Sequence, residues 1–415
     1  MEGHTQGHLK RNREDVLFRI PKTSYFRTRY REISMTVAHL SEIETKKTFI
    51  LKEKRLDLLG RKFMYYVNEH IKNCVRVFPE QGRYDYARYD MNENPEGLPQ
   101  WFVDEVLAEI TPEFLSTYPE HDKFREMYAQ YIGVKPENVA VTNGSDMAIR
   151  FAMEVFAEKG SSVVTVAPSF EMYWVNCTML GLKHVPVSYE SDLTMDAKKI
   201  VDAIDDTTDI VVLLNPNNPI GTVYTESEAR MIIEKAREVG AVVIVDEAYH
   251  YFYKHTFLPF IHEYDNVMVF RTFSKLLSLA AVRMGMMIGN EELIEYARKS
   301  MPSFEVNAIA LKFGEHMMQH TELIEELMET EAEGKAWLLE ELQKHGYDAT
   351  PSHGNFIFIT PKKPAQEVAK ALREKKILIK TFGNEFLKKY VRISTGSKKA
   401  MGYFLEAFLE VDKGV

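Results

Sequence analysis

The chain has 415 residues, of which 45% are hydrophobic and 27% are charged, and its formal net charge is −9. This composition is typical of a globular enzyme with two or more domains, and the negative balance disfavours nucleic acid as a partner. Two cysteines cannot form a disulfide framework, no apolar run is long enough to span a membrane, and the N-terminus lacks an apolar signal core. The sequence therefore predicts a cytoplasmic protein with no membrane partner. The 13 histidines are scattered, so no metal is expected.

Residues 1–80 give the weakest indications of secondary structure in the sequence. Residues 9–31 are rich in arginine and lysine with few core-like positions, which is typical of a mobile arm or of a segment that wraps a partner subunit. Apolar residues between 51 and 77 follow a repeat near 3.6 residues, which predicts amphipathic helices packed on a subunit or domain surface. A regulatory or lid function is the alternative for this N-terminal extension.

A connecting segment at 81–115 contains turn residues at 89–97 and a predicted helix at 98–110. Beyond it, short apolar strands alternate with helices. These predicted strands are 139–142, 162–166, 183–187, 209–214, 241–245, 267–270 and 284–288. The alternation predicts an α/β fold in which a mostly parallel sheet is covered by helices on both faces, within a large domain at 116–300.

Residues 301–415 are predicted to form a smaller α+β domain, against which the connecting segment is expected to pack. A long helical stretch at 291–345 includes an acidic cluster at 325–333, which we interpret as a solvated helix face. The remaining predicted elements are strands at 355–359, 377–379 and 391–394 and helices at 364–374 and 399–410.

Polar turns follow the predicted parallel strands. They lie at 143–146, 168–173, 215–221, 246–249 and 271–275. Ligands of open α/β sheets bind beyond the carboxyl ends of the strands, so we expect these turns to meet at one crevice. The turn at 143–146 also begins a helix, and the free backbone N–H groups of a helix start attract phosphate.

Lys275 stands just past the apolar strand 267–270, among hydroxyl-bearing and small apolar residues. Desolvation at such a position lowers the pKa of a lysine and makes its amine nucleophilic. Thr272, Ser274 and Arg283 are suited to holding a phosphate dianion beside it. An amine that can form a Schiff base next to a phosphate site is what pyridoxal phosphate chemistry requires. A surface lysine in a Ser/Thr loop is the plainer interpretation.

Five motifs follow one another in a fixed order along the chain. They are Asn143-Gly144-Ser145-Asp146, residues 215–221, Asp246-Glu247-Ala248-Tyr249, Ser274-Lys275 with Arg283, and Tyr390-Val391-Arg392-Ile393. They resemble the motifs of fold-type-I pyridoxal phosphate enzymes of aminotransferase class I/II. Residues 92–95, 117–119 and 355–356 fit most closely the histidinol-phosphate aminotransferase group, which includes threonine-phosphate decarboxylase relatives. The likeness covers about residues 85–410.

This resemblance implies a catalytic set. Lys275 would hold the cofactor as a Schiff base and move a proton once the substrate displaces it. Asp246 would contact the pyridine nitrogen and keep it protonated, although capping of the next helix is an alternative for this carboxylate. Asn218 and Tyr249 would donate to the 3-oxygen of the ring.

The resemblance also implies contacts to the remaining parts of the cofactor. The phosphate cup would consist of Ser145, Asp146, Thr272, Ser274 and Arg283. Tyr118 would reach the cofactor phosphate of the neighbouring subunit, which makes the active site a property of a homodimer. Phe170 would stack on the ring face, although simple packing beside Tyr173 is the commoner function of an aromatic side chain.

The resemblance implies that Arg392 binds the substrate carboxylate with a bidentate geometry that lysine cannot copy. The alternative interpretation is that Arg392 is a surface arginine on an edge strand. Asn92 and Lys380 complete the predicted substrate site. Lys380 stands where the group tends to have an arginine for the distal anion, so the charge is kept and the two-pronged geometry is lost. The sequence departs from the family pattern also at Ile220, where threonine is usual, and at Met147, where an acidic residue is usual.

The motifs thus predict a pyridoxal phosphate-dependent aminotransferase that acts on a small amino acid or phosphorylated amine. It would transfer an amino group from an amino acid donor to a keto acid or phosphorylated carbonyl acceptor. Decarboxylation of a phosphorylated or otherwise anionic amino acid, in a specialised biosynthetic pathway, is the alternative, because spacing does not reveal how the reacting bond is oriented. A non-enzymatic regulator is disfavoured by the complete catalytic set.

Overall fold

The structure, a computed structural model, describes residues 65–76 and 81–413. The predictions for residues 9–31 and for 51–64 lie outside these ranges. Within 65–76 the chain forms one short helix, α2 (Glu69–Lys72). Among the described residues, no helix combines the length and the apolar character that a membrane span requires.

The larger of two sheets has seven strands in the order β2-β8-β7-β6-β5-β3-β4. Their bounds are β2 (Val139–Thr142), β3 (Ser162–Ala167), β4 (Lys183–Ser188), β5 (Thr208–Leu214), β6 (Val242–Asp246), β7 (Val267–Thr272) and β8 (Gly285–Gly289). All neighbouring pairs from β4 to β7 are parallel, whereas β8 is antiparallel to both β7 and β2. The mostly parallel sheet predicted from the sequence is therefore confirmed.

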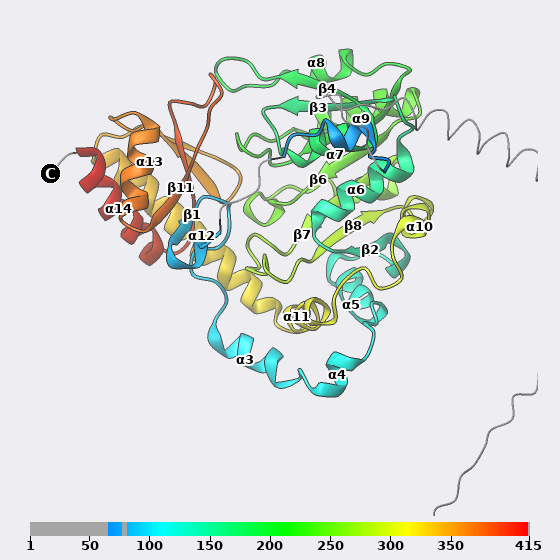
Figure 1. The fold of residues 1–415 in the computed structure, drawn as a ribbon, viewed down its shortest axis with the longest axis horizontal. Helices are drawn as coiled ribbons and strands as arrows, with labels where there is room; N and C mark the ends of the chain where they lie inside the picture. Colours follow the sequence, from blue (N-terminus) through cyan, green and yellow to red (C-terminus); the bar gives the residue numbers. More distant parts are fainter. Residues whose placement is uncertain (1–64, 77–80, 414–415) are drawn as a thin grey trace, which may run out of the picture. The chain divides into compact units, whose positions relative to one another are not determined.

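Helices connect these strands and cover both sheets of the described chain (Figure 1). In chain order they are α3 (Gln100–Ala108), α4 (Pro112–Ser116), α5 (Asp122–Ile132), α6 (Ser145–Phe156), α7 (Met172–Leu180), α8 (Ala197–Asp202), α9 (Glu226–Glu238), α10 (Glu291–Ser300), α11 (Ala308–Gln319), α12 (Thr321–Lys344), α13 (Ala365–Glu374) and α14 (Lys398–Lys413). Local sequence signals mark their ends. Thr225 and Glu228 form a reciprocal capping box that begins α9, and Gly133, with a φ of 75°, ends α5.

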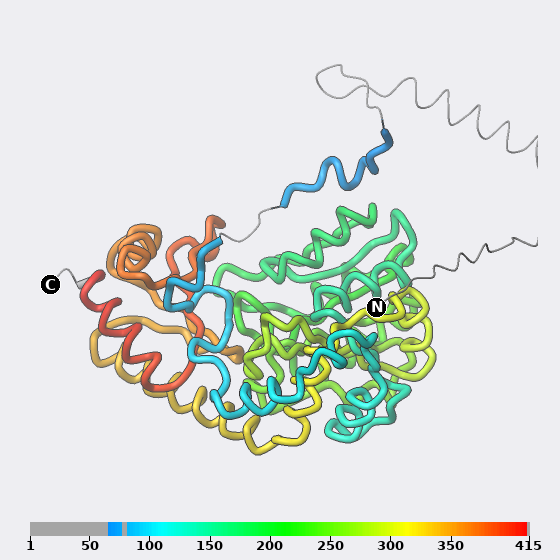
Figure 2. The backbone as a smooth tube through the Cα atoms, turned by 60° about the horizontal axis from the view of Figure 1, so that its bottom comes forward, coloured from blue at the N-terminus to red at the C-terminus, as the bar shows by residue number. Residues whose placement is uncertain are grey.

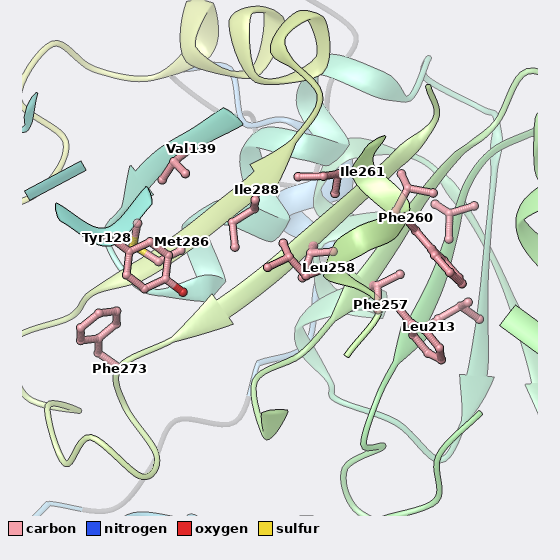
Figure 3. Packing of buried hydrophobic residues seen from close by; sticks show 14 of the residues in the cluster. Tyr128, Val139, Leu213, Phe257, Leu258, Phe260, Ile261, Phe273, Met286 and Ile288 are labelled. Carbon is pink, nitrogen blue, oxygen red and sulfur yellow. The ribbon is translucent and has the colours of Figure 1, made fainter. Parts of the chain in front are cut away.

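Alternate residues of each strand pack on opposite faces of the large sheet, as the two-residue period of a strand requires. In β5, Val211 and Leu213 belong to one buried cluster, whereas Ile210 and Val212 belong to another. Figure 3 shows part of the first cluster, which residues of α3, α5, α9 and α11 close. Residues of α6, α7 and α10 close the second cluster. Burial on both faces explains why the strands are near-continuous apolar runs.

The second sheet has five strands in the order β1-β11-β12-β10-β9. Their bounds are β1 (Ala87–Tyr89), β9 (Ala349–Pro351), β10 (Phe356–Ile359), β11 (Ile377–Thr381) and β12 (Val391–Ser394). Strand β1 comes from the connecting segment and pairs in parallel with β11, whereas the other pairs are antiparallel. In Figures 1 and 2 the long helix α12 runs from α11 towards this sheet, on which α13 and α14 also pack.

The helical stretch predicted at 291–345 is divided into three helices. The side chain of Asn307 accepts a hydrogen bond from the backbone N–H of Ala310 at 2.8 Å and so begins α11. The chain leaves helical geometry again at His320, which separates α11 from α12. A repeat near 3.6 residues does not reveal such breaks, because each new helix continues the apolar pattern.

The acidic cluster at 325–333 faces solvent except at Glu331. This carboxyl group is buried and accepts a hydrogen bond from the hydroxyl of Thr395. Burial raises the pKa of Glu331. The interpretation of the cluster as a solvated face was wrong at this residue, because Glu331 lies about two helical turns from both Ile324 and Leu338 and shares their buried face.

Candidate active site

A cavity of about 250 Å³ lies where β5, β6 and β7 end, at the edge of the sheet where the sequence predicted a crevice. Ten residues that were predicted to bind a cofactor line it. They are Ser145, Asp146, Phe170, Asn218, Asp246, Tyr249, Thr272, Ser274, Lys275 and Arg283. The fold brings them together because β6 ends at Asp246, β7 ends at Thr272 and α6 begins at Ser145.

The amine of Lys275 lies inside this cavity. Its Nζ donates a hydrogen bond to the carbonyl oxygen of Met91 at 2.9 Å, and it lies 5.8 Å from the centre of the Tyr249 ring. Burial, followed by the positive charge of Arg392, lowers the pKa of Lys275 to about 8, although Glu93 acts in the opposite direction. A useful fraction of this side chain is therefore a neutral, nucleophilic amine near physiological pH.

Asp246 is a buried carboxyl group held by two donors. The hydroxyl of Tyr173 donates to its Oδ2 at 2.7 Å, and the backbone N–H of Ala248 donates to its Oδ1 at 3.1 Å. Burial raises the pKa of Asp246 to about 6, and both hydrogen bonds act in the opposite direction. A carboxylate in this setting is suited to pairing with a protonated nitrogen of a ligand.

Hydroxyl groups and a guanidinium gather at the first turn of α6. Arg283 donates from Nη2 to Asp146 Oδ2 at 3.1 Å and from Nη1 to Ser274 Oγ at 3.4 Å. Gly144, with a φ of 76°, precedes Ser145, and a Cβ at this position would come within 2.6 Å of Arg283 Nη2. Only glycine fits there, and the chain passes close to a set of donors suited to a phosphate dianion.

Arg392 joins β12 to the edge of the cavity. Its Nη1 donates to Asn218 Oδ1 at 2.6 Å, and its Nη2 donates to the carbonyl oxygen of Asp90 at 2.9 Å. The guanidinium lies over the ring of Phe356 at 5.2 Å, and burial lowers the pKa of Arg392 to about 10. Its Nε is buried without a partner, so the N–H of this atom is unused in the absence of a ligand.

Asn92 joins the connecting segment to β12 and to the turn that follows β6. It has a φ of 57°, a left-handed conformation that asparagine tolerates. Its side-chain amide donates to the hydroxyl of Tyr249 at 2.9 Å, and its backbone N–H donates to Ser394 Oγ at 2.8 Å. Asn355 donates in turn to the carbonyl oxygen of Asn92 at 2.9 Å.

Four predicted site residues are not among those that line the cavity. Asn92 and Arg392 hydrogen-bond to the lining residues Tyr249 and Asn218, and the other two are Tyr118 and Lys380. The side chain of Tyr118 is 73% exposed and stacks on the ring of Phe304, with ring centres 4.2 Å apart. Lys380 is exposed on β11, directly across the strand pair from Arg392. Within one chain, neither residue is therefore part of the group that surrounds Lys275.

Sequence reasoning missed some residues that shape the site. Tyr173 was interpreted only as a packing partner of Phe170, yet its hydroxyl binds Asp246. Ser394 and the carbonyl oxygen of Met91 were not predicted to act at all. The one available signal was the place of Tyr173 within the polar turn at 168–173, which follows a predicted strand.

Comparison with known proteins identifies the family. A model of the family described as aminotransferase class I and II matches residues 89–408, which is most of the chain. The chain therefore belongs to the class I and II aminotransferases. It is an enzyme, a pyridoxal phosphate-dependent transferase, and the fold, the enzyme class and the cofactor predicted from the sequence are confirmed.

Three relatives illustrate the likeness. Histidinol-phosphate aminotransferase from Caldanaerobacter subterraneus subsp. tengcongensis is 32% identical over 350 residues, which cover 83% of this chain and 98% of the relative. The protein of the same name from Pyrococcus furiosus is 30% identical over 326 residues, covering 76% of this chain and 92% of the relative. The crystal structure of histidinol-phosphate aminotransferase from Sinorhizobium meliloti in complex with pyridoxal-5'-phosphate has a TM-score of 0.75 at 22% identity, covering 85% of this chain and 98% of that chain. The predicted activity, amino-group transfer, is thus supported, and none of these three proteins is a decarboxylase.

Proposed function

We propose that Lys275 carries pyridoxal phosphate through a Schiff base. The bound cofactor withdraws electrons from the α-carbon of the substrate and so makes its proton removable. The observation that carries the proposal is the place of Lys275 in a cavity that it shares with Asp246 and with the phosphate-binding donors around Arg283. The low pKa of Lys275 suits its amine first as a nucleophile and then, once the substrate has replaced it, as the group that moves the proton at the α-carbon.

The donor set around Lys275 fits the polar parts of pyridoxal phosphate. Asp246 would pair with the pyridine nitrogen, and Asn218 and Tyr249 would donate to the 3-oxygen. Phe170 would cover one face of the ring. The phosphate would be held by Ser145, Asp146, Thr272, Ser274 and Arg283. The close approach of Gly144 to Arg283 supports this cup, because the space that a Cβ would fill is needed there by the guanidinium.

The proposed substrate is an amino acid or phosphorylated amine that carries an anion. Arg392 would bind its carboxylate, and the partnerless Nε of this residue supports that function. Asn92 and Lys380 would complete the substrate site. The names of the curated relatives make histidinol phosphate the first compound to test, with a keto acid such as 2-oxoglutarate as acceptor.

The same proposal includes a cytoplasmic homodimer in which Tyr118 reaches the cofactor phosphate of the neighbouring subunit. The exposed stack of Tyr118 and Phe304 supports this proposal in one respect, because it leaves both rings accessible to a neighbouring subunit. The described cysteines, Cys74 and Cys177, are free thiols, which fits a reducing compartment. The proposed division is an N-terminal extension (1–80), a connecting segment (81–115), a large domain (116–300) and a small domain (301–415).

The experiment is a substrate panel that combines amino-group transfer with mass spectrometry. Wild-type protein should convert histidinol phosphate or a related anionic amine to the corresponding carbonyl compound and form glutamate from 2-oxoglutarate. Lys275→Ala should abolish the reaction, whereas Lys254→Ala, a change at an exposed lysine, should not. Carbon dioxide release from a phosphorylated amino acid, without amino-group transfer to any acceptor, would contradict the proposed reaction.

The homodimer is tested separately by mixing variants. Light scattering after gel filtration should give twice the mass of the chain. Equal amounts of Lys275→Ala and Tyr118→Phe protein, unfolded and refolded together, should restore roughly a quarter of the complete sites, because random pairing places one intact site in each mixed dimer. If the refolded mixture is no more active than the Tyr118→Phe protein that it contains, the site is not shared between subunits.

A further inference from the structure

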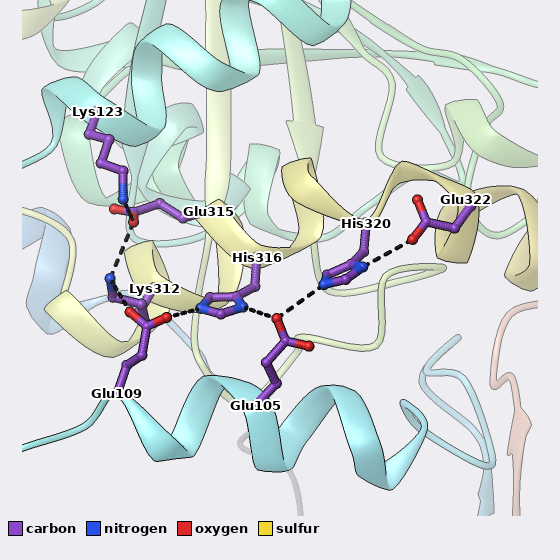
Figure 4. A network of polar contacts seen from close by, with 8 residues as sticks. All are labelled: Glu105, Glu109, Lys123, Lys312, Glu315, His316, His320 and Glu322. Atoms are coloured by element: carbon purple, nitrogen blue, oxygen red, sulfur yellow. Dashed lines mark hydrogen bonds and ion pairs between the residues drawn. The ribbon is translucent and has the colours of Figure 1, made fainter.

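A second polar cluster lies away from the cavity, where α3 meets the junction of α11 and α12. Glu105 of α3 faces two histidines that are four residues apart (Figure 4). Its Oε1 is 3.2 Å from His316 Nδ1 and 3.1 Å from His320 Nε2. One ligand atom from each of these three residues lies within 4.8 Å of the other two.

These spacings suit a metal ion. A tetrahedral zinc ion bound at about 2.0–2.1 Å keeps its ligand atoms about 3.3–3.4 Å apart. Two imidazoles and one carboxylate are a ligand set that zinc and similar divalent transition metals accept. His316 is buried, His320 is half-buried and Glu105 is exposed, so an ion held between them would keep a side open to water.

The outer nitrogens of both rings add a separate argument. His316 Nε2 is 3.0 Å from Glu109 Oε1, and His320 Nδ1 is 3.0 Å from Glu322 Oε1. Metal-bound histidines commonly donate their second N–H to a carboxylate, which orients the ring and makes it a better ligand. Each ring here presents one nitrogen to the shared carboxylate and the other to a carboxylate of its own.

In this arrangement both nitrogens of each ring face a carboxylate oxygen. The Nζ of Lys312 lies 3.0 Å from Glu109 Oε2, so the charge of this carboxylate is already paired. A ring that binds a metal through its inner nitrogen and donates the N–H of its outer nitrogen to a carboxylate has this geometry.

We propose that Glu105, His316 and His320 bind one divalent transition-metal ion, with zinc the best match. The ion would join α3, which follows the segment that carries Asn92, to the start of α12, which leads to the second sheet. Its function is to hold the connecting segment in place, separately from the chemistry at Lys275.

Zinc uptake by the complete, cofactor-loaded protein tests the proposal. Chelator-treated protein is dialysed against low micromolar zinc chloride, and bound metal is counted by mass spectrometry. Wild type should hold one zinc ion per chain, and Glu105→Gln and His320→Gln should each lose it. His262→Gln, a change at an exposed histidine outside the cluster, should retain it. Glu322→Gln should still bind zinc about tenfold more weakly, because only the outer contact is removed.

Trp101 provides a second readout, because its ring centre is 5.3 Å from that of His320. Nickel or cobalt at the site should quench the fluorescence of wild-type protein, and the loss of signal should be much smaller in Trp101→Phe and in His320→Gln. Circular dichroism shows whether each variant is folded. Equal zinc uptake by folded wild-type and His320→Gln protein, or no uptake by either, would overturn the proposal and leave a metal-free cluster of ion pairs.

Discussion

The hydroxyl of Tyr173 donates a hydrogen bond of 2.7 Å to the buried carboxyl group of Asp246. This bond favours the ionised form of Asp246, against the burial that raises its pKa to about 6. Asp246 acts on the pyridine nitrogen, in our account, only as a carboxylate. Tyr173 is then a positioning residue that keeps Asp246 charged at physiological pH.

Tyr173→Phe should therefore shift the acid limb of the pH profile of kcat to higher pH. The expected loss in kcat near neutral pH is about tenfold, the effect of removing one hydrogen bond to a charged group. Tyr296→Phe, which removes an exposed hydroxyl on α10, is the control. An acid limb that does not move in Tyr173→Phe would show that this bond only contributes to packing.

Asp246→Asn should stabilise the cofactor-free protein while removing activity. The folded pKa of Asp246 is about 6, above the ordinary value of 3.8, so between these pH values the folded state binds more protons than the unfolded state. Stability contributed by this group is therefore lost as pH rises through that window. Above pH 6, burial of the charged carboxylate lowers the unfolding free energy of the wild type by an amount on the order of 1–3 kcal/mol. Asparagine is uncharged and avoids this loss.

Urea unfolding of cofactor-free protein at pH 5 and at pH 8 measures this effect. The gain in unfolding free energy from Asp246→Asn should be larger at pH 8 than at pH 5. Asp265→Asn, at an exposed position, should show no such difference. Equal gains at both pH values would mean that burial of charge is not the cause.

Cofactor uptake should follow the ionisation of Lys275. Only the neutral amine attacks an aldehyde, so the rate at which cofactor-free protein takes up pyridoxal phosphate should rise through a midpoint near pH 8 and then level off. Arg392→Gln removes a neighbouring positive charge and should raise that midpoint. Stopped-flow absorbance between pH 6 and pH 10 measures the rate. A midpoint near the ordinary lysine value of 10.5 would contradict the desolvated amine.

Arg283→Gln should weaken the binding of pyridoxal phosphate by roughly 10–100-fold, the range expected for charge-assisted hydrogen bonds to an anion. Pyridoxal, which has no phosphate, should bind wild type and variant almost equally. The comparison separates loss of the cup from general damage to the cavity. If both compounds lose affinity to the same extent, Arg283 does not contact the phosphate.

The arrangement of the large sheet could be predicted because it rests on local patterns. Continuous apolar runs such as 209–214 indicate strands buried on both faces, and the polar residues after them mark the carboxyl edge. That edge is where Lys275 and Asp246 do meet. The predicted contacts of Tyr118 to a neighbouring subunit and of Lys380 to a substrate anion stay predictions, because both depend on molecules outside the single chain.

What sequence reasoning missed are contacts between residues far apart in the chain. Tyr173 is 73 residues from Asp246, and a tyrosine in a turn has the same local pattern whether it packs or donates. Glu331 sits in an acidic run, and only its place on the buried face of α12 distinguishes it. The four-residue spacing of His316 and His320 was visible, but Glu105 is 211 residues from His316 and gave no local signal.

The most direct measurement is reduction of the purified, cofactor-loaded enzyme with borohydride, followed by peptide mapping. Borohydride fixes a Schiff base as a stable amine, so the labelled residue is the one that carries the cofactor. We predict a single phosphopyridoxyl group on the peptide that contains Lys275, and none in Lys275→Ala. A label on another lysine of the wild-type chain would contradict it.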